Sequence, residues 1–388
     1  MSLTDRKVKT MFFKFTEAQK MMRKMAREFS EKEIAPLDAE MDRKEEFPVE
    51  LFKKMSQNGF LGVVFPEEYQ GGGADTVTGA LVVWEIARAS ASVALSLDAH
   101  WLAADTVLYH GTDEQKKKYL PLAAQDTLFA FALTEPGAGS DAAGLLTAAV
   151  QEGGEYVLNG TKAWCTNAEV AGVFIIMAKT DKTKGAKGIS AFIVEKGNPG
   201  LTVGKKEINL GMRGSVQNEV ILNNCRVKKE ALLGREGDGF KIAMIALDGA
   251  RISIGAIAGG LCERAIAVST AYARQRQAFG GPIANLQAIQ FMIADMAVGL
   301  HAVKLMTFDT AALKDAQVRH TKEAAMTKIL GSTHAVKCGL NCIQILGGSG
   351  YSRENPAERI LRDAKMLEIG EGTTEILKML VGRTELAG

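Results

Sequence analysis

The spacing of apolar residues changes twice along this chain. Between residues 21 and 29, apolar residues recur every three or four positions, while lysine and glutamate occupy the opposite side. This spacing predicts an amphipathic helix, which Pro36 should end because proline cannot continue it. Residues 78–109 are largely apolar and predict further helices.

The spacing changes near residue 127. Short runs rich in β-branched residues, at Val173–Ala178, Ile189–Val194 and Glu219–Leu222, lie between glycine, asparagine and proline residues and predict strands. Asn159-Gly160 lies between two apolar pairs, which is a signal for a tight hairpin turn. This middle part is therefore expected to be a small β domain.

Helical spacing returns after about Gly234. Apolar residues at every third or fourth position form one stripe from Leu286 to Leu300, and similar stripes continue to Leu346. The predicted fold is α+β, with an N-terminal helical bundle (1–126), a middle β-sandwich or barrel (127–234) and a C-terminal four-helix bundle (235–388). In such a three-part fold, the active site is expected where the parts meet.

The charge balance narrows the possible functions. The chain carries 47 Lys and Arg residues against 45 Asp and Glu residues, a net charge of +2. A nucleic-acid-binding protein would show a concentrated basic surface, so no nucleic-acid partner is expected. The N-terminus lacks the apolar core of a signal peptide, and the absence of any run of about 18 uncharged apolar residues predicts no membrane span. The expected location is the bacterial cytoplasm, or the mitochondrial matrix in a eukaryote.

The five cysteines are odd in number, and no two have C-x-x-C spacing. This usage argues against a secreted disulfide framework and predicts buried thiols in a reducing compartment. Cys338 and Cys342 are spaced to share a helix face, but two thiols rarely bind a metal alone, and no nearby histidine is expected to complete a site. No metal site is therefore predicted.

Several motifs carry residue types suited to binding, although each is also consistent with a plain structural role. T-E-P-G-A-G-S-D, beginning at Thr134, lets backbone N–H groups approach a ligand, or it is a surface loop. In G-T-K-A-W-C-T-N, Trp164 either stacks beside a flat ring or plugs the β core. Arg274 and Arg276, close to Phe279, either grip a phosphate or are solvated.

Two further motifs lie near the C-terminus. Q-I-L-G-G-S-G-Y, beginning at Gln344, has three glycines that permit close contact with its backbone. Glu371 lies between Gly370 and Gly372, on a predicted loop before the last helix. A lone glutamate on a loop is commonly a solvated charge, so this motif too is ambiguous when taken alone.

The order of the motifs is more specific than any one of them. The runs T-E-P-G-A-G-S-D, G-T-K-x-W-x-T-N, R-x-x-F-G, Q-x-x-G-G-x-G-Y and R-D-A-K…E-G-T resemble the acyl-CoA dehydrogenase family over essentially the whole chain. The resemblance implies the three-part fold, FAD as cofactor, a homotetramer, an acyl-CoA substrate and an electron-transferring flavoprotein as electron acceptor. An oxygen-using relative and a non-catalytic flavoprotein are the alternative interpretations.

The resemblance also implies roles for individual residues. Cofactor contacts are expected from Leu133, Thr134, Gly139, Ser140, Trp164, Thr166, Arg276, Phe279, Gln287, Gln344, Gly347, Gly348, Thr373 and Glu375. Substrate contacts are expected from Ser140, Asp98, Asp248, Arg251, Gly370 and Gly372. Many relatives carry Gln or Thr where this chain has Ala278, so one side-chain contact to FAD is expected to be missing.

Glu371 matches the catalytic base of the family. It is expected to remove the α proton of the thioester while a hydride leaves the β carbon for the flavin, which gives a 2-enoyl-CoA. The family stabilises the developing enolate with the backbone N–H of the base and a ribityl hydroxyl of the flavin. Some relatives carry the base at the position of Ala250, which cannot accept a proton. Burial by substrate should raise the pKa of Glu371 towards the working pH.

The acyl group is expected to be short, branched or compact. Gly370 stands where many straight-chain enzymes carry Tyr, and its surroundings resemble isovaleryl-CoA dehydrogenases; alternatively, it serves only the loop backbone. Asp98 lies on the helix that closes the acyl pocket in relatives, either as a polar group at the pocket floor or as a second base. Ser92 stands where glutaryl-CoA enzymes carry Arg, which disfavours a dicarboxylate substrate.

Overall fold

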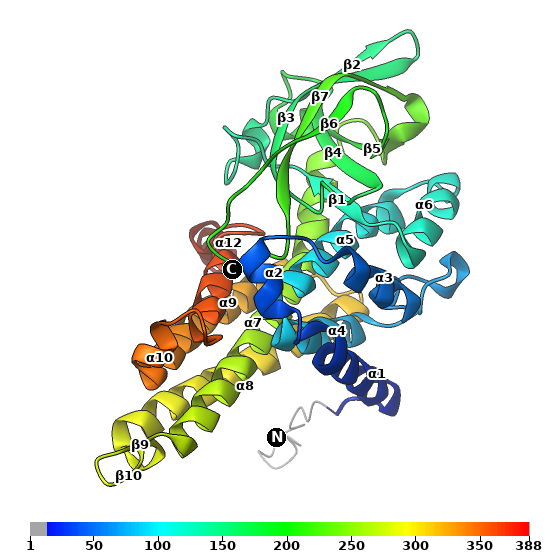
Figure 1. The fold of residues 1–388 in the computed structure, drawn as a ribbon. Coiled ribbons are helices and arrows are strands. Elements are labelled where there is room, and N and C mark those ends of the chain that lie inside the picture. The colour runs from blue at the N-terminus through cyan, green and yellow to red at the C-terminus, as the bar shows by residue number, and fades with distance from the viewer. Residues whose placement is uncertain (1–13, 388) are drawn as a thin grey trace, which may run out of the picture.

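The computed structural model describes residues 14–387 and shows a β part resting on two sets of helices (Figure 1). The N-terminal helices are α1 (Glu17–Phe29), α2 (Asp38–Lys44), α3 (Val49–Gln57), α4 (Thr76–Ala89), α5 (Ala91–His110) and α6 (Asp113–Gln125). The helix predicted around residues 21–29 is α1, which a wider turn, η1 (Ser30–Ile34), ends just before Pro36. The helices predicted in residues 78–109 are α4 and α5, and both are buried on almost every side.

The middle part is a β domain with its own apolar core. Its strands are β1 (Phe129–Ala132), β2 (Ala148–Glu152), β3 (Glu155–Thr166), β4 (Val173–Lys179), β5 (Ile189–Glu195), β6 (Leu201–Lys206), β7 (Gln217–Lys228) and β8 (Leu232–Leu233). They form one sheet in the order β6-β7-β3-β2-β4-β5-β8, and β1 pairs in parallel with β4. Buried aromatic residues such as Phe174 and Phe192 fill the inside of this sheet.

The hairpin predicted at Asn159-Gly160 is wrong. Both residues lie inside the long strand β3, where the pairing with β7 shifts register between Leu158 and Gly160. A side chain at Gly160 would begin 2.3 Å from the Thr147 hydroxyl, so the glycine permits a close approach of two chains. The tight turn lies earlier, where Gly153 and Gly154 adopt positive φ angles between β2 and β3.

The C-terminal part returns to long helices. They are α7 (Gly239–Gln275), α8 (Gln287–Asp315), α9 (Thr321–Leu346), α10 (Gly348–Tyr351), α11 (Ala357–Leu367) and α12 (Thr374–Leu386), and a small hairpin of β9 (Gln277–Ala278) and β10 (Gly281–Pro282) joins α7 to α8. A Cβ at Gly259 of α7 would lie 2.0 Å from the ring of Trp84 on α4. Because α4 approaches α7 this closely, the N-terminal and C-terminal helices share one buried apolar core.

Two of these helices, α7 and α8, have the length and hydropathy of membrane-crossing helices. The sequence prediction of no membrane span rested on the absence of long uncharged runs, and length and hydropathy alone do not test it. The most apolar window of α7 is 72% buried inside the protein, as expected for the central helix of a bundle, whereas that of α8 is 22% buried. Much of the apolar surface of α8 is therefore uncovered by the described residues of this chain.

Candidate active site

Glu371 lies on the loop between α11 and α12. Two positively charged side chains from the long helices hydrogen-bond to the backbone of this loop. The Arg251 Nε donates to the Glu371 carbonyl at 3.1 Å, and the Lys328 Nζ donates to the Gly372 carbonyl at 2.7 Å. Glu371 itself adopts a positive φ of 57°, which is uncommon for a residue with a side chain. Such a conformation persists only where the surroundings enforce it, and functional sites are common places for it.

The Glu371 side chain is the unsatisfied group of this loop. Its Oε2 atom is buried and has no hydrogen-bond partner among the described residues. Burial raises the pKa of Glu371, while the positive charges of Arg251 and Lys328 lower it. A buried carboxyl oxygen without a partner is rare, and a buried group with opposing influences on its pKa is a candidate for chemistry.

Arg251 is itself fixed by the helix that carries it. Its Nη1 atom donates to Asp248 at 2.7 Å, and the other oxygen of Asp248 accepts from the Thr321 hydroxyl at 2.7 Å. The structure therefore brings Asp248 and Arg251, both predicted from the motifs, next to Glu371. Lys328 was not predicted, because a lysine at one position of the long helix α9 gives no signal in the sequence.

Asp98 is a second buried carboxyl group near Glu371. Burial and the charge of Glu371 raise its pKa well above the usual range, while the Ser253 hydroxyl, which hydrogen-bonds to it, opposes the shift. Its Oδ2 atom is buried without a hydrogen-bond partner in the described part of the chain. Burial therefore favours the protonated form of Asp98, and its free Oδ2 can take part in one more hydrogen bond.

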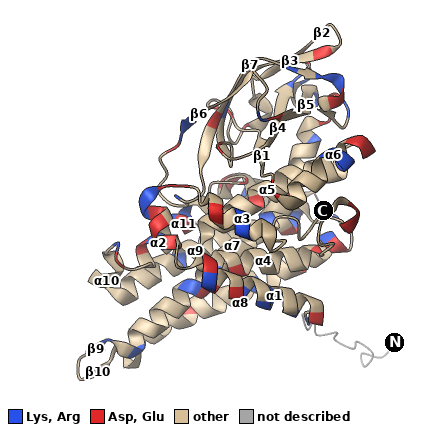
Figure 2. Ribbon diagram, turned by 45° about the vertical axis from the view of Figure 1, so that its right-hand side comes forward, with Lys and Arg blue, Asp and Glu red and all other residues tan. Residues whose placement is uncertain are grey.

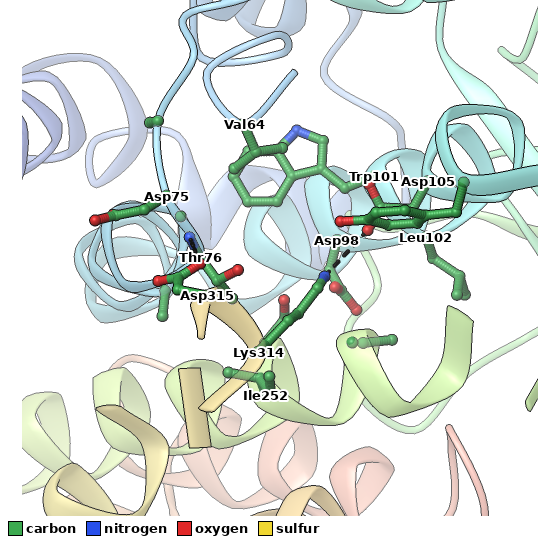
Figure 3. A pocket seen from close by; sticks show the side chains of 17 residues that line it. Val64, Asp75, Thr76, Asp98, Trp101, Leu102, Asp105, Ile252, Lys314 and Asp315 are labelled. Atoms are coloured by element: carbon green, nitrogen blue, oxygen red, sulfur yellow. Dashed lines mark hydrogen bonds and ion pairs between the residues drawn. The ribbon is translucent and has the colours of Figure 1, made fainter. Parts of the chain in front are cut away.

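Asp98 also lines a cavity of about 170 Å³ between α4, α5 and α7 (Figure 3). Apolar walls come from residues such as Trp101 and Leu102, and Ala250 closes one side. Asp105 and Lys314 form an ion pair of 3.3 Å that also faces this space. The cavity is thus compact and mixed in character, because charged residues such as Asp75 and Asp315 line it beside the apolar ones.

The T-E-P-G-A-G-S-D loop is held against β3 by a buried ion pair that sequence reasoning missed. Lys162 donates to Glu135 at 2.7 Å and to the Leu133 carbonyl at 3.1 Å. Glu135 also accepts from the backbone N–H groups of Leu146 and Thr147. Burial lowers the pKa of Lys162 to about 8, even beside this carboxylate.

Trp164 does not plug the β core, so that structural alternative is wrong. The register of β3 with β7 shifts between Lys162 and Cys165, and this bulge turns Trp164 outward with a φ of 56°. The Trp164 side chain is 56% exposed. Thr166, two residues later, accepts a hydrogen bond of 3.4 Å from Gln217.

The same region has open backbone. A Cβ added at Gly137 or Gly139 would meet nothing within 4 Å, and Ser140 beside them is exposed. Thr134 joins this loop to β3, since its carbonyl accepts from the Ala163 N–H at 2.9 Å. A flat exposed ring beside an accessible glycine loop fits a planar aromatic cofactor with polar edges.

Other predicted residues lie at the ends of the long helices. Arg276, Phe279 and Gln287 surround the β9–β10 hairpin, at the far end of the arm in Figure 1, and the Phe279 ring is 93% exposed. Gly347 and Gly348 of the Gln344 motif are exposed where α9 ends, whereas Gly350 is buried. This chain alone therefore does not bring these two groups to the Glu371 loop.

Four predicted residues lie within four positions of Glu371 in the chain. Thr373 caps α12 by accepting from the Ile376 N–H, and Glu375 points to solvent in the first turn of that helix. A side chain at Gly370 would begin 2.7 Å from the tip of Met366, so Met366 already fills part of the space beside this glycine. Gly372 contributes the carbonyl that Lys328 holds.

Comparison with known proteins adds an independent result. Models of the N-terminal, middle and C-terminal domains of acyl-CoA dehydrogenases match residues 16–127, 130–225 and 237–386. The chain is 47% identical over 375 residues to an acyl-CoA dehydrogenase of Bacillus subtilis strain 168, covering 96% of this chain and 99% of that protein. It is similar to the structure of butyryl-CoA dehydrogenase from Megasphaera elsdenii, with a TM-score of 0.95, 40% identity and coverage of 97% and 100% of the two chains. A chain from a study of the electron transferring flavoprotein of Acidaminococcus fermentans gives a TM-score of 0.96 at 42% identity, with the same coverage.

Proposed function

The chain belongs to the acyl-CoA dehydrogenase family, and from this premise we propose that it oxidises a short, branched or otherwise compact acyl-CoA with Glu371 as the base. As a member of this family, the protein is an FAD-dependent oxidoreductase that dehydrogenates an acyl-CoA. The observation that carries the proposal is the buried, unpartnered Oε2 of Glu371 on a loop held by Arg251 and Lys328.

The chemistry follows from what these residues offer. A proton α to a thioester is weakly acidic, so its removal needs a base whose pKa has been raised, and burial raises that of Glu371. The backbone N–H of Glu371 is proposed to donate to the thioester oxygen, where negative charge develops. FAD supplies a hydride acceptor for the β carbon when it is bound. The exposed Trp164 and the open Thr134–Ser140 loop are the groups proposed to hold its ring.

Anaerobic mixing with acyl-CoA substrates tests this function. The flavin absorbance should bleach with butyryl-CoA or a compact branched acyl-CoA, because the flavin receives the two electrons that leave the substrate. A panel that includes isovaleryl-, octanoyl- and cyclohexanecarbonyl-CoA ranks the acyl groups. A flavin that stays oxidised with every member of the panel would favour the alternatives, a non-catalytic flavoprotein or an oxygen-using relative with a different substrate.

Lys328→Met should move the acidic limb of the kcat/KM profile to higher pH. Lys328 lowers the pKa of Glu371 by its positive charge, so removing the charge raises that pKa, and Glu371 is then deprotonated only at higher pH. The measurement is the rate of flavin reduction across pH 5–9, a range that brackets a raised carboxyl pKa. Lys328→Arg, which keeps the charge, is the control. An unchanged limb in the methionine variant would show that Lys328 serves only the loop backbone.

The cavity beside Asp98 supports a compact acyl group. An apolar cavity of roughly 150 Å³ can bind benzene in another protein, so the 170 Å³ found here has the volume for a group of about six carbon atoms. We propose that the neutral Asp98 carboxyl forms the polar floor of the acyl site and hydrogen-bonds to a polar or unsaturated acyl end.

Asp98→Asn should therefore change the ranking of substrates. Its kcat/KM for butyryl-CoA should stay nearly constant, while polar or unsaturated acyl groups should lose up to about fivefold, the value of one hydrogen bond, because the amide is a weaker donor than a carboxylic acid. A loss of about 100-fold or more confined to cyclic unsaturated acyl groups would instead assign Asp98 as a second base. Equal changes for all acyl groups would exclude a role at the acyl end.

The uncovered face of α8 supports the proposed homotetramer. Phe291, Val298 and Leu305 are exposed at intervals of seven residues and so lie on one side of the helix. Figure 2 shows the outer part of α8 as mostly uncharged ribbon. We propose that this face packs against other copies, which would bring Arg276, Phe279 and Gln287 to the cofactor of a neighbour. The electron acceptor is proposed to be an electron-transferring flavoprotein, and the proposed location is the cytoplasm of a bacterium.

A further inference from the structure

Three buried side chains with metal-ligating atoms meet between α7 and α9, away from the Glu371 loop. They are Cys262 of α7 and His334 and Cys338 of α9, and their ligating atoms all lie within 4.8 Å of one another. Cys338 lies ten residues beyond Lys328 on α9, which is about 15 Å along the helix at ~1.5 Å per residue. The expectation that no histidine stands near Cys338 was wrong, because four helical residues bring His334 onto the same face.

The surrounding helices make room for the histidine. A Cβ at Gly299 of α8 would lie 2.0 Å from the His334 ring, so only glycine allows α8 to lie against this imidazole. The Nε2 atom of His334 is 3.0 Å from the Met296 carbonyl and 3.3 Å from the Cys338 sulfur. One ring nitrogen therefore faces both a carbonyl oxygen of α8 and a thiol of α9.

We propose that Cys262, His334 and Cys338 bind one Zn²⁺ ion, which joins α7 to α9. Two thiolates and a neutral imidazole are ligands that zinc accepts, at roughly 2.3 Å for sulfur and 2.0 Å for nitrogen. Tetrahedral geometry at these bond lengths places neighbouring ligand atoms roughly 3.5–3.8 Å apart, so the cluster needs to contract by about 1 Å at most. The Met296 carbonyl, already beside His334 Nε2, is the group placed to complete the coordination.

Charge distinguishes zinc from other soft cations. Two thiolates neutralise a divalent ion, so the complex carries no net charge in a site where all three side chains are buried. A monovalent ion such as Cu⁺ would leave one uncompensated negative charge there. The ion would fix α7 and α9, the two helices that supply Arg251 and Lys328 to the Glu371 loop.

Metal analysis of the FAD-loaded enzyme tests the proposal. The protein is treated with a chelator, reloaded with ZnSO4, passed through chelating resin and analysed for zinc by mass spectrometry. The unmodified chain should hold one zinc per chain after reloading, and Cys338→Ala and Cys262→Ala should hold none. Cys342→Ser is the matched control, since Cys342 is buried one turn further along α9 and lies outside the cluster; it should keep the zinc.

A second measurement covers variants that fold poorly. In the unmodified enzyme, the thermal midpoint after chelation should rise when ZnSO4 is restored, and modification of thiols by a small reagent during unfolding should slow. Zinc below one-tenth of an equivalent in the reloaded unmodified enzyme would overturn the proposal, as would equal zinc in Cys338→Ala and the unmodified chain. In either case the cluster is a thiol–imidazole contact of the core.

Discussion

Glu371→Gln should retain FAD and the fold but lose flavin reduction by acyl-CoA, by a factor of about 10⁴, the upper range for a general base. Glutamine has nearly the size of glutamate, so the loop held by Arg251 and Lys328 has no reason to move. It has no basic oxygen with which to accept the α proton. The measurement is the anaerobic rate of bleaching in a stopped-flow instrument, with butyryl-CoA as substrate.

Glu368→Gln is the matched control for this experiment. Glu368 lies three residues earlier, and its partly buried carboxylate pairs with Lys365 at the end of α11 rather than hydrogen-bonding to the Glu371 loop. Its variant should reduce flavin at nearly the original rate. If Glu371→Gln reduced flavin as fast as this control, another group would have to remove the proton, and Asp98 would be the next candidate because it lies close enough for Glu371 to affect its pKa.

The pH dependence of thermal stability provides a second test of the Glu371 carboxyl group. Burial holds the pKa of Glu371 above its unfolded value of 4.5, so the unfolded chain releases this proton more readily. The charged form therefore costs stability once the pH rises above 4.5, and the cost vanishes below it. Glu371→Gln should consequently unfold at an equal or higher temperature than the unmodified enzyme at neutral pH, with no difference at pH 4.

Much of the fold follows from periodic spacing. The runs Val173–Ala178 and Ile189–Val194 became β4 and β5 because residues with β-branched side chains pack well on both faces of a buried strand. Asn159-Gly160 failed as a turn because a local preference was overridden by a tertiary contact with Thr147. No property of the dipeptide itself could have shown that contact.

The candidate site was less accessible to sequence reasoning. Flanking glycines located the Glu371 loop, but the missing partner of its Oε2 depends on the packing of three helices. The role of Glu135 was hidden for a similar reason, since its partner Lys162 lies 27 positions later. Spacing within α9 could have placed His334 beside Cys338, whereas Cys262 comes from a different helix and needed the structure.

Lys162→Met should destabilise the β domain by about 3–5 kcal/mol, the usual loss when one partner of a buried ion pair is removed. Lys162 is fully buried, and its removal leaves the Glu135 carboxylate with only its two backbone donors. The loop from Thr134 to Ser140 should loosen as well, because Lys162 also holds the Leu133 carbonyl. FAD should therefore dissociate at a lower temperature, which the rise in flavin fluorescence during heating measures. Lys228→Met, at an exposed end of β7, should change the free energy of unfolding by no more than about 0.5 kcal/mol.

The double variant Lys162→Met/Glu135→Gln tests the cause of the stability lost in Lys162→Met. The loss comes either from the broken charge pair or from the packing and hydrogen bond of the lysine side chain. If the penalty comes from an uncompensated buried carboxylate, neutralising Glu135 restores part of the loss, so the double variant is more stable than the sum of the single losses by about 1–3 kcal/mol. Glu135→Gln alone should lose less stability than Lys162→Met. Burial lowers the pKa of Lys162 to about 8, so this lysine can release its proton once its partner is neutral. The stability lost in Glu135→Gln should also become smaller as the pH rises towards 9, since a neutral amine needs no counter-charge. Purely additive losses that do not vary with pH would mean that Lys162 supports the loop by packing and its hydrogen bond to Leu133 alone.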